Sequence, residues 1–425
     1  MADKLRARKT PATVLATGAP ASGLVDGADS EKIATLDHAL HALWALGRNV
    51  VLVWTPSGKG IDVLVIPHYA ILDSYGSAAL GDVSGDPFDY FAADFSDGRP
   101  KSFIEDVISS PKRVAQNQLA HIARVLGFAP QHVVLPFVPG KGLGLDAIEA
   151  IVKRYSISYV EDRAVALFDI VGFSLYTPLE QVTQLNSLAY SVNAAYSKML
   201  RKKIAISFAR TTTGDGFYIW NRDRTVQANV NLYHFMHLVL ADNAIARSKS
   251  KGNTTPKLRT CFHVGGHYEF YQSEGLSPTI YSYIVGDVTI ELARMIERAM
   301  PGQVLVGNFW VPMPDKETGR LVKIDTAAFI EKTQATLSSL KGLELSGDEV
   351  DSIKCYLTGE RMPNDSFGIK KYLIADKHGR TRSVYNAKIN IYRRQADPIF
   401  LGVQNKELVG FKHVGADFID AKPSE

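Results

Sequence analysis

Apolar residues in the first part of the chain fall into short runs that predict a small α/β unit. Residues 31–47 carry them at helical spacing, and two strand-like runs, NVVLVWT and IDVLVIP, follow with PSGKG between them, which predicts a β-hairpin. A glycine-rich acidic stretch at 81–100 predicts a loop. Helical patterns return near 102–127, and the run HVVLPFV predicts one more strand. No set of residues suited to catalysis appears in this part of the sequence.

Longer elements are predicted in the second part of the chain. The apolar run AVALFDIVGFS at 164–174 predicts a buried strand. TPLE at 177–180 has the pattern of a helix start with a capping box and proline at the first helical position, so a helix is expected to about residue 203. TTTGDGFYIW at 211–220 predicts two strands joined by a tight turn, and a second helix is expected at about 225–247.

The last part of the chain has a less regular pattern. VLVG at 304–307 and KKYLIAD at 370–376 predict strands, and helical patterns lie between them near 326–340 and 347–357. These patterns divide the chain into a flexible N-terminal arm at 1–30, an N-terminal α/β domain at 31–150, a main domain at 155–395 with a long insertion at about 308–368, and a C-terminal extension at 396–425.

The composition is that of a soluble globular protein. The 425 residues are 46% hydrophobic and 22% charged, and this length predicts about two or three domains. A net charge of +4 over this length does not favour a nucleic-acid partner, and no apolar stretch approaches the ~20 residues that span a bilayer. The two cysteines, Cys261 and Cys355, lie in apolar runs and suit a reducing compartment, so a cytoplasmic location is expected.

Two aspartates stand out because each lies beside a predicted strand end. Asp169 interrupts an apolar run, and Asp215 lies in a Gly-Asp-Gly turn. Two carboxylates that face each other need a cation, and hard oxygen ligands favour Mg²⁺ or Mn²⁺. A pair of such ions is a common device for displacement at phosphorus. The residues alone therefore indicate metal-dependent chemistry on a phosphate ester.

Four blocks of sequence, in order, resemble the catalytic domain of class III nucleotidyl cyclases. They are LFDIVGFS at 167–174, TTTGDGFYIW at 211–220, KLRTCFHVGG at 257–266 and YIVGDVTIELARMIE at 283–297. The likeness covers roughly residues 155–310 and returns near 369–395. It implies an α/β (α+β) protein with a ferredoxin-like core, in which a central, mostly antiparallel sheet is flanked by helices, beside the smaller N-terminal α/β domain.

The resemblance also implies roles for single residues. Asp169 and Asp215, with the backbone carbonyl of Ile170, resemble the ligands of two Mn²⁺ or Mg²⁺ ions in each active site. Arg259 resembles the arginine that contacts the substrate phosphates, and Arg294 resembles the transition-state arginine that the partner subunit supplies. The implied reaction is attack of the ribose 3′ hydroxyl on the α-phosphate, with pyrophosphate as the leaving group.

The positions that read the base differ from those of purine cyclases. Adenylyl cyclases have a lysine and an aspartate where this chain has Thr211 and Tyr283, and guanylyl cyclases have a glutamate and a cysteine there. A bulky ring and a short hydroxyl favour a smaller base. In this the chain resembles the bacterial pyrimidine cyclases of the Pycsar antiphage systems, whose products, cyclic UMP or cyclic CMP, activate a separate effector. On that resemblance UTP is the expected substrate, with CTP as the alternative.

Further positions depart from the cyclase pattern. Ile290 stands where the family has an asparagine that orients the ribose, and it precedes Arg294 by one helical turn. Lys377 and Arg380 are the candidates for the family's late phosphate-binding lysine, although neither lies in the usual Lys-Gly pattern. A nucleotide-binding signalling domain without activity and a purine cyclase with an altered pocket are therefore the alternative hypotheses.

One cyclase-like core in each chain implies a homodimer. The family places the metal ligands and the base-reading residues of one site in complementary subunits, so a second copy would complete each site. The expected partners are a nucleoside triphosphate, a second copy of the chain and, through the product, a separate cyclic-nucleotide-responsive effector. Neither a nucleic acid nor a membrane is expected as a partner.

Overall fold

The computed structural model of the protein describes residues 27–71, 103–273, 280–315, 318–345, 347–358, 369–375, 381–404, 407–408 and 419–420. The loop predicted at 81–100 lies outside the described residues, as does the predicted N-terminal arm up to residue 26. The last four residues of that arm belong to the first helix, α1 (Gly27–Trp44), so the arm as predicted extends too far. No helix in the described part of the chain is long and apolar enough to cross a membrane.

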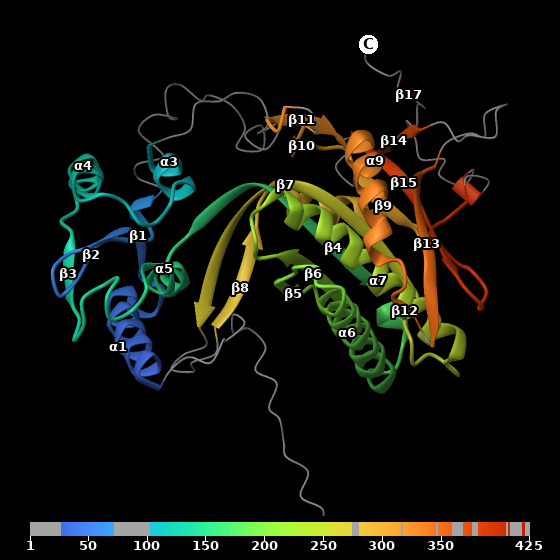
Figure 1. Cartoon of the computed structure of the whole chain (residues 1–425), viewed down its shortest axis with the longest axis horizontal. Helices are drawn as coiled ribbons and strands as arrows, with labels where there is room; N and C mark the ends of the chain where they lie inside the picture. The colour runs from blue at the N-terminus through green and yellow to red at the C-terminus, as the bar shows by residue number, and fades with distance from the viewer. Residues whose placement is uncertain are drawn as a thin grey trace, which may run out of the picture.

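A small antiparallel sheet organises the N-terminal unit (Figure 1, blue to cyan). Its strands β1 (Asn49–Pro56), β2 (Gly60–Pro67) and β3 (Gln131–Val134) follow one another in that order, so the predicted hairpin is confirmed. α1 and α5 (Leu145–Val152) pack in one apolar cluster, and α3 (Phe103–Ser109) and α4 (Gln116–Leu126) pack in another. The side chains alternate along the strands, so the two clusters lie on opposite faces of this sheet.

The main unit begins with a β-α-β-β-α-β sequence. Its elements are β4 (Ser158–Ile170), α6 (Pro178–Arg201), β5 (Phe208–Thr212), β6 (Gly216–Asn221), α7 (Val226–Lys249) and β7 (Leu258–Ser273). The strands are hydrogen-bonded in the order β7-β4-β6-β5, and every neighbouring pair is antiparallel. This is the ferredoxin-like order, so the predicted core topology is confirmed. The predicted start of α6 is confirmed as well, because Thr177 and Glu180 form a capping box.

Helices cover both faces of this sheet. Ala164, Ala166 and Phe168 of β4 pack on one face against α6 and α7. Val165 and Leu167, which point to the other face, pack against α8 (Asp287–Arg298). α8 follows β8 (Ile280–Val285), which pairs with β7, and precedes β9 (Val304–Gly307), which runs parallel to β7.

Part of the predicted insertion extends the same sheet, and its first two strands form a separate two-stranded sheet. Its elements are β10 (Trp310–Pro314), β11 (Leu321–Asp325), α9 (Thr326–Thr336), β12 (Glu344–Leu345) and β13 (Asp348–Leu357), and β14 (Lys370–Ala375), β15 (Thr381–Arg393), β16 (Ile399–Leu401) and β17 (Ile419–Asp420) follow. Short 3₁₀ helices are Ala45–Gly47, Lys153–Tyr155, Phe173–Leu175 and Leu337–Leu340. β13 pairs with β15, and β15 pairs with β9, so the large sheet continues through the insertion in the order β12-β13-β15-β9-β7.

The helix predicted near 347–357 is wrong, because this segment is strand β13. A β-bulge shifts its register between Val350 and Ser352. Val350, Ile353 and Leu357 are therefore buried on one strand although they are three and four residues apart, which is the spacing of a helix. The helical pattern predicted near 326–340 is confirmed by α9 and the 3₁₀ helix that follows it.

Buried histidines are expected to make the fold sensitive to acid. Burial lowers the pKa of His234 and of His263 to about 4, and that of His267 to about 3, from the ordinary value of 6.5. The folded chain therefore binds fewer protons than the unfolded chain below pH 6.5, and each histidine should lower the free energy of unfolding by about 2 kcal/mol at pH 5 relative to pH 7 or above. Urea unfolding at both pH values measures this difference.

A His234→Gln variant provides the control for that experiment. Glutamine can keep a hydrogen bond to the Thr336 hydroxyl, which lies 3.1 Å from His234 Nε2, and it does not titrate. The variant should therefore show a smaller loss of stability between pH 7 and pH 5 than the natural chain. Equal stability of the natural chain at the two pH values would contradict the prediction.

Candidate active site

Asp169 and Asp215 come together at one end of the central sheet. Asp169 is the next-to-last residue of β4, with a side chain that is only 8% exposed, and it pairs across the sheet with Gly216 of β6. The N–H of Ile170 donates to the carbonyl of Asp215 at 3.0 Å. Burial raises the pKa of Asp169, and the charge and hydrogen bonding of Asp215 raise it further, against the opposing effect of Arg259. The strand pairing and this hydrogen bond therefore place Asp169 and Asp215 beside each other at the end of the sheet.

Two glycines let the Asp215 turn approach β4 closely. Gly214 has φ +99°, a conformation that other residues rarely adopt. A Cβ atom on Gly216 would lie 1.9 Å from the carbonyl oxygen of Phe168, so any side chain at this position would push the hairpin away from β4. The Gly-Asp-Gly sequence is thus required by the approach that brings Asp215 to Asp169.

Arg259 lies beside these carboxylates. It pairs across the sheet with Asp169, and its Nε donates to Asp169 Oδ2 at 2.5 Å. This guanidinium lowers the pKa of Asp169 and so opposes the effects of burial and of Asp215. Asp169 and Arg259 lie two residues from Leu167 and Cys261 on their strands and so point to the same face as these two residues, which belong to the cluster beneath α8. The charged group therefore lies on the face of the sheet that α8 covers.

The donor set suits a hard cation that takes its remaining ligands from a substrate. The described residues contain no group of three or more His, Cys, Asp and Glu side chains that could hold a metal, so a cation here would depend on Asp169, Asp215, a backbone carbonyl and external oxygens. Mg²⁺ commonly binds through one or two carboxylates plus substrate phosphates and water. Ile170 directs its N–H toward Asp215, and in an antiparallel ladder the carbonyl of the same residue points to the same side. Burial and the charge of Asp215 keep the pKa of Asp169 raised despite its ion pair with Arg259, so an added cation here would favour the charged carboxylate.

The other predicted site residues lie on different elements. Ile290 and Arg294 are one turn apart on α8, with exposed fractions of 46% for Ile290 and 24% for the Arg294 side chain. Arg294 Nη1 lies 3.8 Å from the Glu297 carboxylate on the same helix. α8 is fixed to the sheet near this point because the Tyr218 hydroxyl donates to the carbonyl of Thr289 at 3.2 Å.

The two predicted base-reading residues lie on strands that contact each other. Thr211 is on β5 and Tyr283 is on β8. The ring of Tyr283 stacks on Phe270 of β7, with a centroid distance of 5.6 Å and an interplanar angle of 22°. Phe270 was not predicted from the sequence, although the density of aromatic residues in HYEFYQ at 267–272 is a signal for it. Lys377 and Arg380 lie outside the described residues.

Nucleotide cyclase domains are found among similar solved structures. The guanylate cyclase domain of RhGC from Catenaria anguillulae, solved in complex with GTP, is 15% identical with a TM-score of 0.29, over 40% of this chain and 97% of that one. The adenylyl cyclase CyaB from P. aeruginosa is 12% identical with a TM-score of 0.32, over 57% of this chain and 98% of that one. A class III adenylyl cyclase-like ATP-binding protein from Pseudomonas aeruginosa is 12% identical with a TM-score of 0.28, over 36% of this chain and 34% of that one.

Sequence comparisons add no family. No protein-family model matches the chain, and no curated protein matches it. TM-scores between 0.28 and 0.32 say nothing of what this chain binds or does. Its chemistry must therefore be inferred from its own side chains and from the order of its strands.

Proposed function

We propose that this protein is a nucleotidyl cyclase that converts UTP to 3′,5′-cyclic UMP and pyrophosphate. The observation that carries the proposal is the position of Asp169 and Asp215 on paired segments at the end of β4, beside Arg259. The charge of Asp215 raises the pKa of Asp169, and two neighbouring carboxylates repel each other unless a cation lies between them. The ferredoxin-like strand order and the four cyclase-like sequence blocks agree with this chemistry.

Each charged residue would have a distinct part in the reaction. Asp169, Asp215 and the Ile170 carbonyl would hold two Mn²⁺ or Mg²⁺ ions, which lower the pKa of the ribose 3′ hydroxyl and neutralise the triphosphate. Arg259 compensates the Asp169 charge in the protein alone. Once that carboxylate has a metal partner, the guanidinium is released to bind substrate phosphates. Arg294 of the second copy would spread positive charge over the phosphate oxygens as the bonds change.

The base-reading residues favour a pyrimidine. The rings of Tyr283 and Phe270 stack on each other, and such a bulky pair at a base-reading position would leave less volume for a purine, while Thr211 offers one short hydroxyl in place of a long charged side chain. A hydroxyl can donate or accept a hydrogen bond, so CTP is the alternative substrate and cyclic CMP the alternative product. UTP is preferred on the resemblance to the Pycsar cyclases, and the same resemblance is the basis for proposing a role in antiphage defence, in which the product acts on a separate effector.

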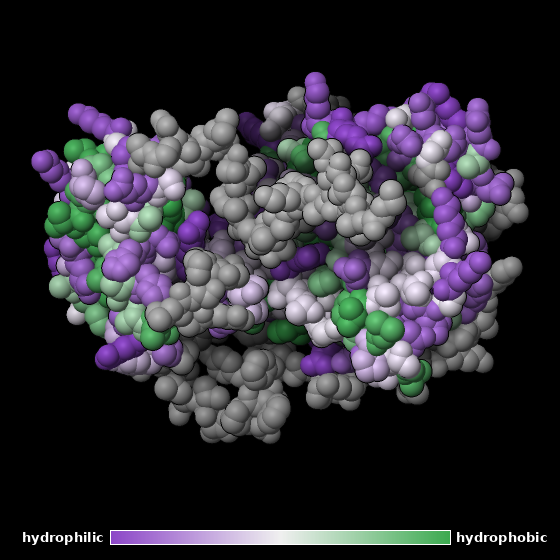
Figure 2. All heavy atoms as spheres, turned by 90° about the horizontal axis from the view of Figure 1, so that it is seen from below, coloured by the Kyte–Doolittle hydropathy of each residue, from purple (hydrophilic) through white to green (hydrophobic). Residues whose placement is uncertain are grey.

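Two exposed apolar groups support a homodimer. Leu175, Leu179 and Val182 are 87%, 76% and 64% exposed and follow the strand that carries Asp169. Val285 and Ile290, 55% and 46% exposed, flank the start of the helix that carries Arg294. Figure 2 shows one face of the molecule, on which apolar residues (green) lie in separate groups among hydrophilic residues (purple). In a two-fold dimer, the group at Leu175 in each copy can contact the group at Val285 in the other copy, so two such contacts form. This arrangement would bring Asp169 of one copy toward Arg294 of the other.

A nucleotide-binding domain without activity is the second candidate. Ile290 supports it, because an exposed apolar side chain stands where an amide would orient the ribose. Retention of both carboxylates and both arginines favours the cyclase, since binding alone does not require paired metal ligands.

Product analysis tests the proposal directly. The purified chain is incubated with each of the four ribonucleoside triphosphates and Mn²⁺, and the products are identified by mass. Cyclic UMP is expected from UTP, and it should disappear with EDTA, with Asp169→Ala and with 3′-deoxy-UTP, which lacks the attacking hydroxyl. Asp351→Ala removes an exposed aspartate from β13 and should keep full activity.

Each other outcome has a defined meaning. Cyclic CMP from CTP would change the base but keep the chemistry. A cyclic purine nucleotide would refute the interpretation of Thr211 and Tyr283. Absence of any product, together with measurable binding of a triphosphate, would favour the nucleotide-binding domain.

A further inference from the structure

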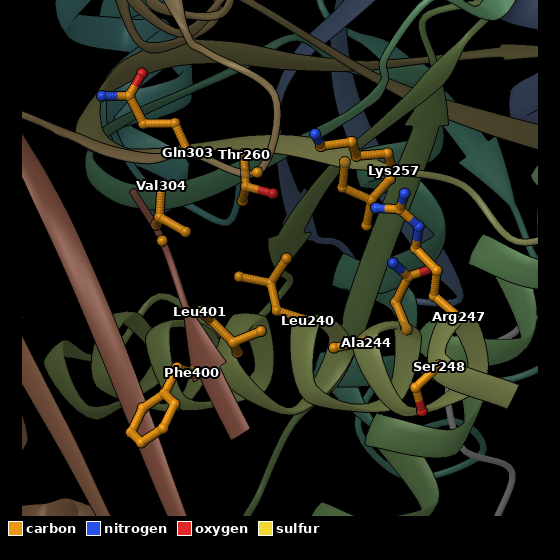
Figure 3. Close-up of a pocket in the computed structure, with 14 residues that line it drawn as sticks. Leu240, Ala244, Arg247, Ser248, Lys257, Thr260, Gln303, Val304, Phe400 and Leu401 are labelled. Atoms are coloured by element: carbon orange, nitrogen blue, oxygen red, sulfur yellow. The ribbon is translucent and has the colours of Figure 1, made fainter. Parts of the chain in front are cut away.

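A pocket lies on the face of the sheet opposite to the candidate active site. It has a volume of about 360 Å³ and lies between α7, the first residues of β7 and β9, and β16. Figure 3 shows Leu240, Ala244 and Arg247 of α7 facing Thr260 and Val304 of the strands. Thr260 alternates with Arg259 along β7, so the pocket and the charged group are on opposite faces of one strand. Ligand pockets are typically ~300–1,000 Å³, so this volume suits a small molecule.

Two buried polar atoms in the pocket lining lack hydrogen-bond partners. They are Asn243 Oδ1 and Thr260 Oγ1, in residues that are 5% and 1% exposed. Asn243 Nδ2 donates to the carbonyl of Pro256 at 3.1 Å, which fixes the orientation of the amide and leaves its oxygen as a free acceptor. Leaving such atoms unpaired costs about 1–3 kcal/mol each. A ligand that brings a hydrogen-bond donor would recover this free energy.

Two exposed cations also line the pocket. They are Arg247 and Lys257, and neither forms an ion pair within the described part of the chain. Arg247 follows Asn243 by four residues on α7, so both lie on the helix face that lines the pocket. Leu240, Leu258, Val304 and Leu401 supply the apolar part of the wall. The pocket thus combines an apolar wall, free buried polar atoms and positive charge.

We propose that this pocket binds a small organic anion with an apolar body and a hydrogen-bond donor, of the class of hydroxylated aryl carboxylates. The carboxylate would pair with Arg247 and Lys257, the apolar body would contact the leucines, and the donor would reach Asn243 Oδ1. The Lys257 carbonyl accepts the N–H of Val171 at 2.9 Å, and Leu258 pairs with Ile170. The ligand would therefore contact the segment of β7 that borders the metal-binding end of β4.

Calorimetric titration with three matched probes tests this proposal. 4-Hydroxyphenylacetate has all the required features, phenylacetate lacks the donor, and 4-hydroxyphenylethanol lacks the charge. The first probe should bind with a Kd at least about tenfold lower than that of either of the others. This difference in affinity corresponds to the free energy of one hydrogen bond or ion pair in a partly buried site. The variants Thr260→Val and Asn243→Leu remove the free polar atoms. In these variants 4-hydroxyphenylacetate should no longer bind more tightly than phenylacetate.

Charge and volume variants complete the test. Arg247→Gln with Lys257→Gln should abolish the advantage of the acid over the neutral probe, whereas Lys251→Gln, an exposed lysine outside the lining, should not. Ala244→Phe should fill the pocket and prevent binding while the unfolding temperature stays close to that of the natural chain. Binding of no probe at millimolar concentration, or equal binding by the natural chain and these variants, would overturn the proposal. The readout is binding, so its failure is distinct from failure of the cyclase proposal.

Discussion

Chains with Asp169→Ala and chains with Arg294→Ala, each inactive alone, are expected to regain activity when they are mixed and allowed to exchange partners. Each single change should lower kcat by at least about 10³, because one removes a metal ligand and the other a group that stabilises transition-state charge. A mixed dimer contains one site in which both lesions meet and one in which Asp169 and Arg294 are both intact. Random pairing of equal amounts should therefore restore about a quarter of the natural activity.

The same experiment contains its own control. Asp169→Ala and Asp215→Ala affect the same half of the site, since the two residues lie on paired segments of one chain. A mixed dimer of these two chains has a lesion in both sites, so no recovery is expected. Recovery in this control, or none in the first mixture despite proven exchange of subunits, would contradict a site shared between two copies.

Replacement of the two proposed base-reading residues is expected to change the substrate from the proposed pyrimidine nucleotide to ATP. Tyr283→Asp removes a ring that stacks on Phe270, and Thr211→Lys places a long donor on the neighbouring strand. Together they recreate the pair that adenylyl cyclases use. The ratio of kcat/KM for UTP to kcat/KM for ATP should fall by at least about 100-fold, because a polar site rejects a base that leaves its groups unpaired. Steady-state kinetics with UTP, CTP and ATP measure this ratio.

Tyr281→Asp is the matched control for the base switch. Tyr281 lies two residues before Tyr283 on β8, so both side chains point to the same face, and it is 41% exposed. The same chemical change at this position should leave the preference for UTP in place. An unchanged ratio in the double variant with retained activity would show that other residues read the base.

Local signals in the sequence predicted most of the core and the tight turn that carries Asp215. The capping box at Thr177 and the glycine turn around Asp215 depend only on neighbouring residues, and both are present in the structure. β13 was missed because a bulge at Val350 gives a strand the spacing of a helix. The Asp169–Arg259 ion pair depends on the register of two strands that are 90 residues apart, which no local pattern specifies.

Features built from distant segments could not be predicted from local patterns. The pocket is lined by residues of α7, β7, β9 and β16. That two of its polar atoms have no hydrogen-bond partner can be recognised only from the positions of all the surrounding residues. The stack of Phe270 on Tyr283 likewise depends on the pairing of β7 with β8. Whether Thr211 and Tyr283 read a pyrimidine stays a prediction.

The strands that follow the cyclase-like blocks set the boundaries of any shortened expression fragment. β9 pairs with β15, and Gln303 Nε2 donates to Asn386 Oδ1 at 2.9 Å in a buried hydrogen bond. A fragment cut after residue 307 would leave β9 as an open edge and Gln303 without this partner, and open edges promote aggregation. Crystallisation or screening of the cyclase-like part alone should therefore retain the chain at least through β15.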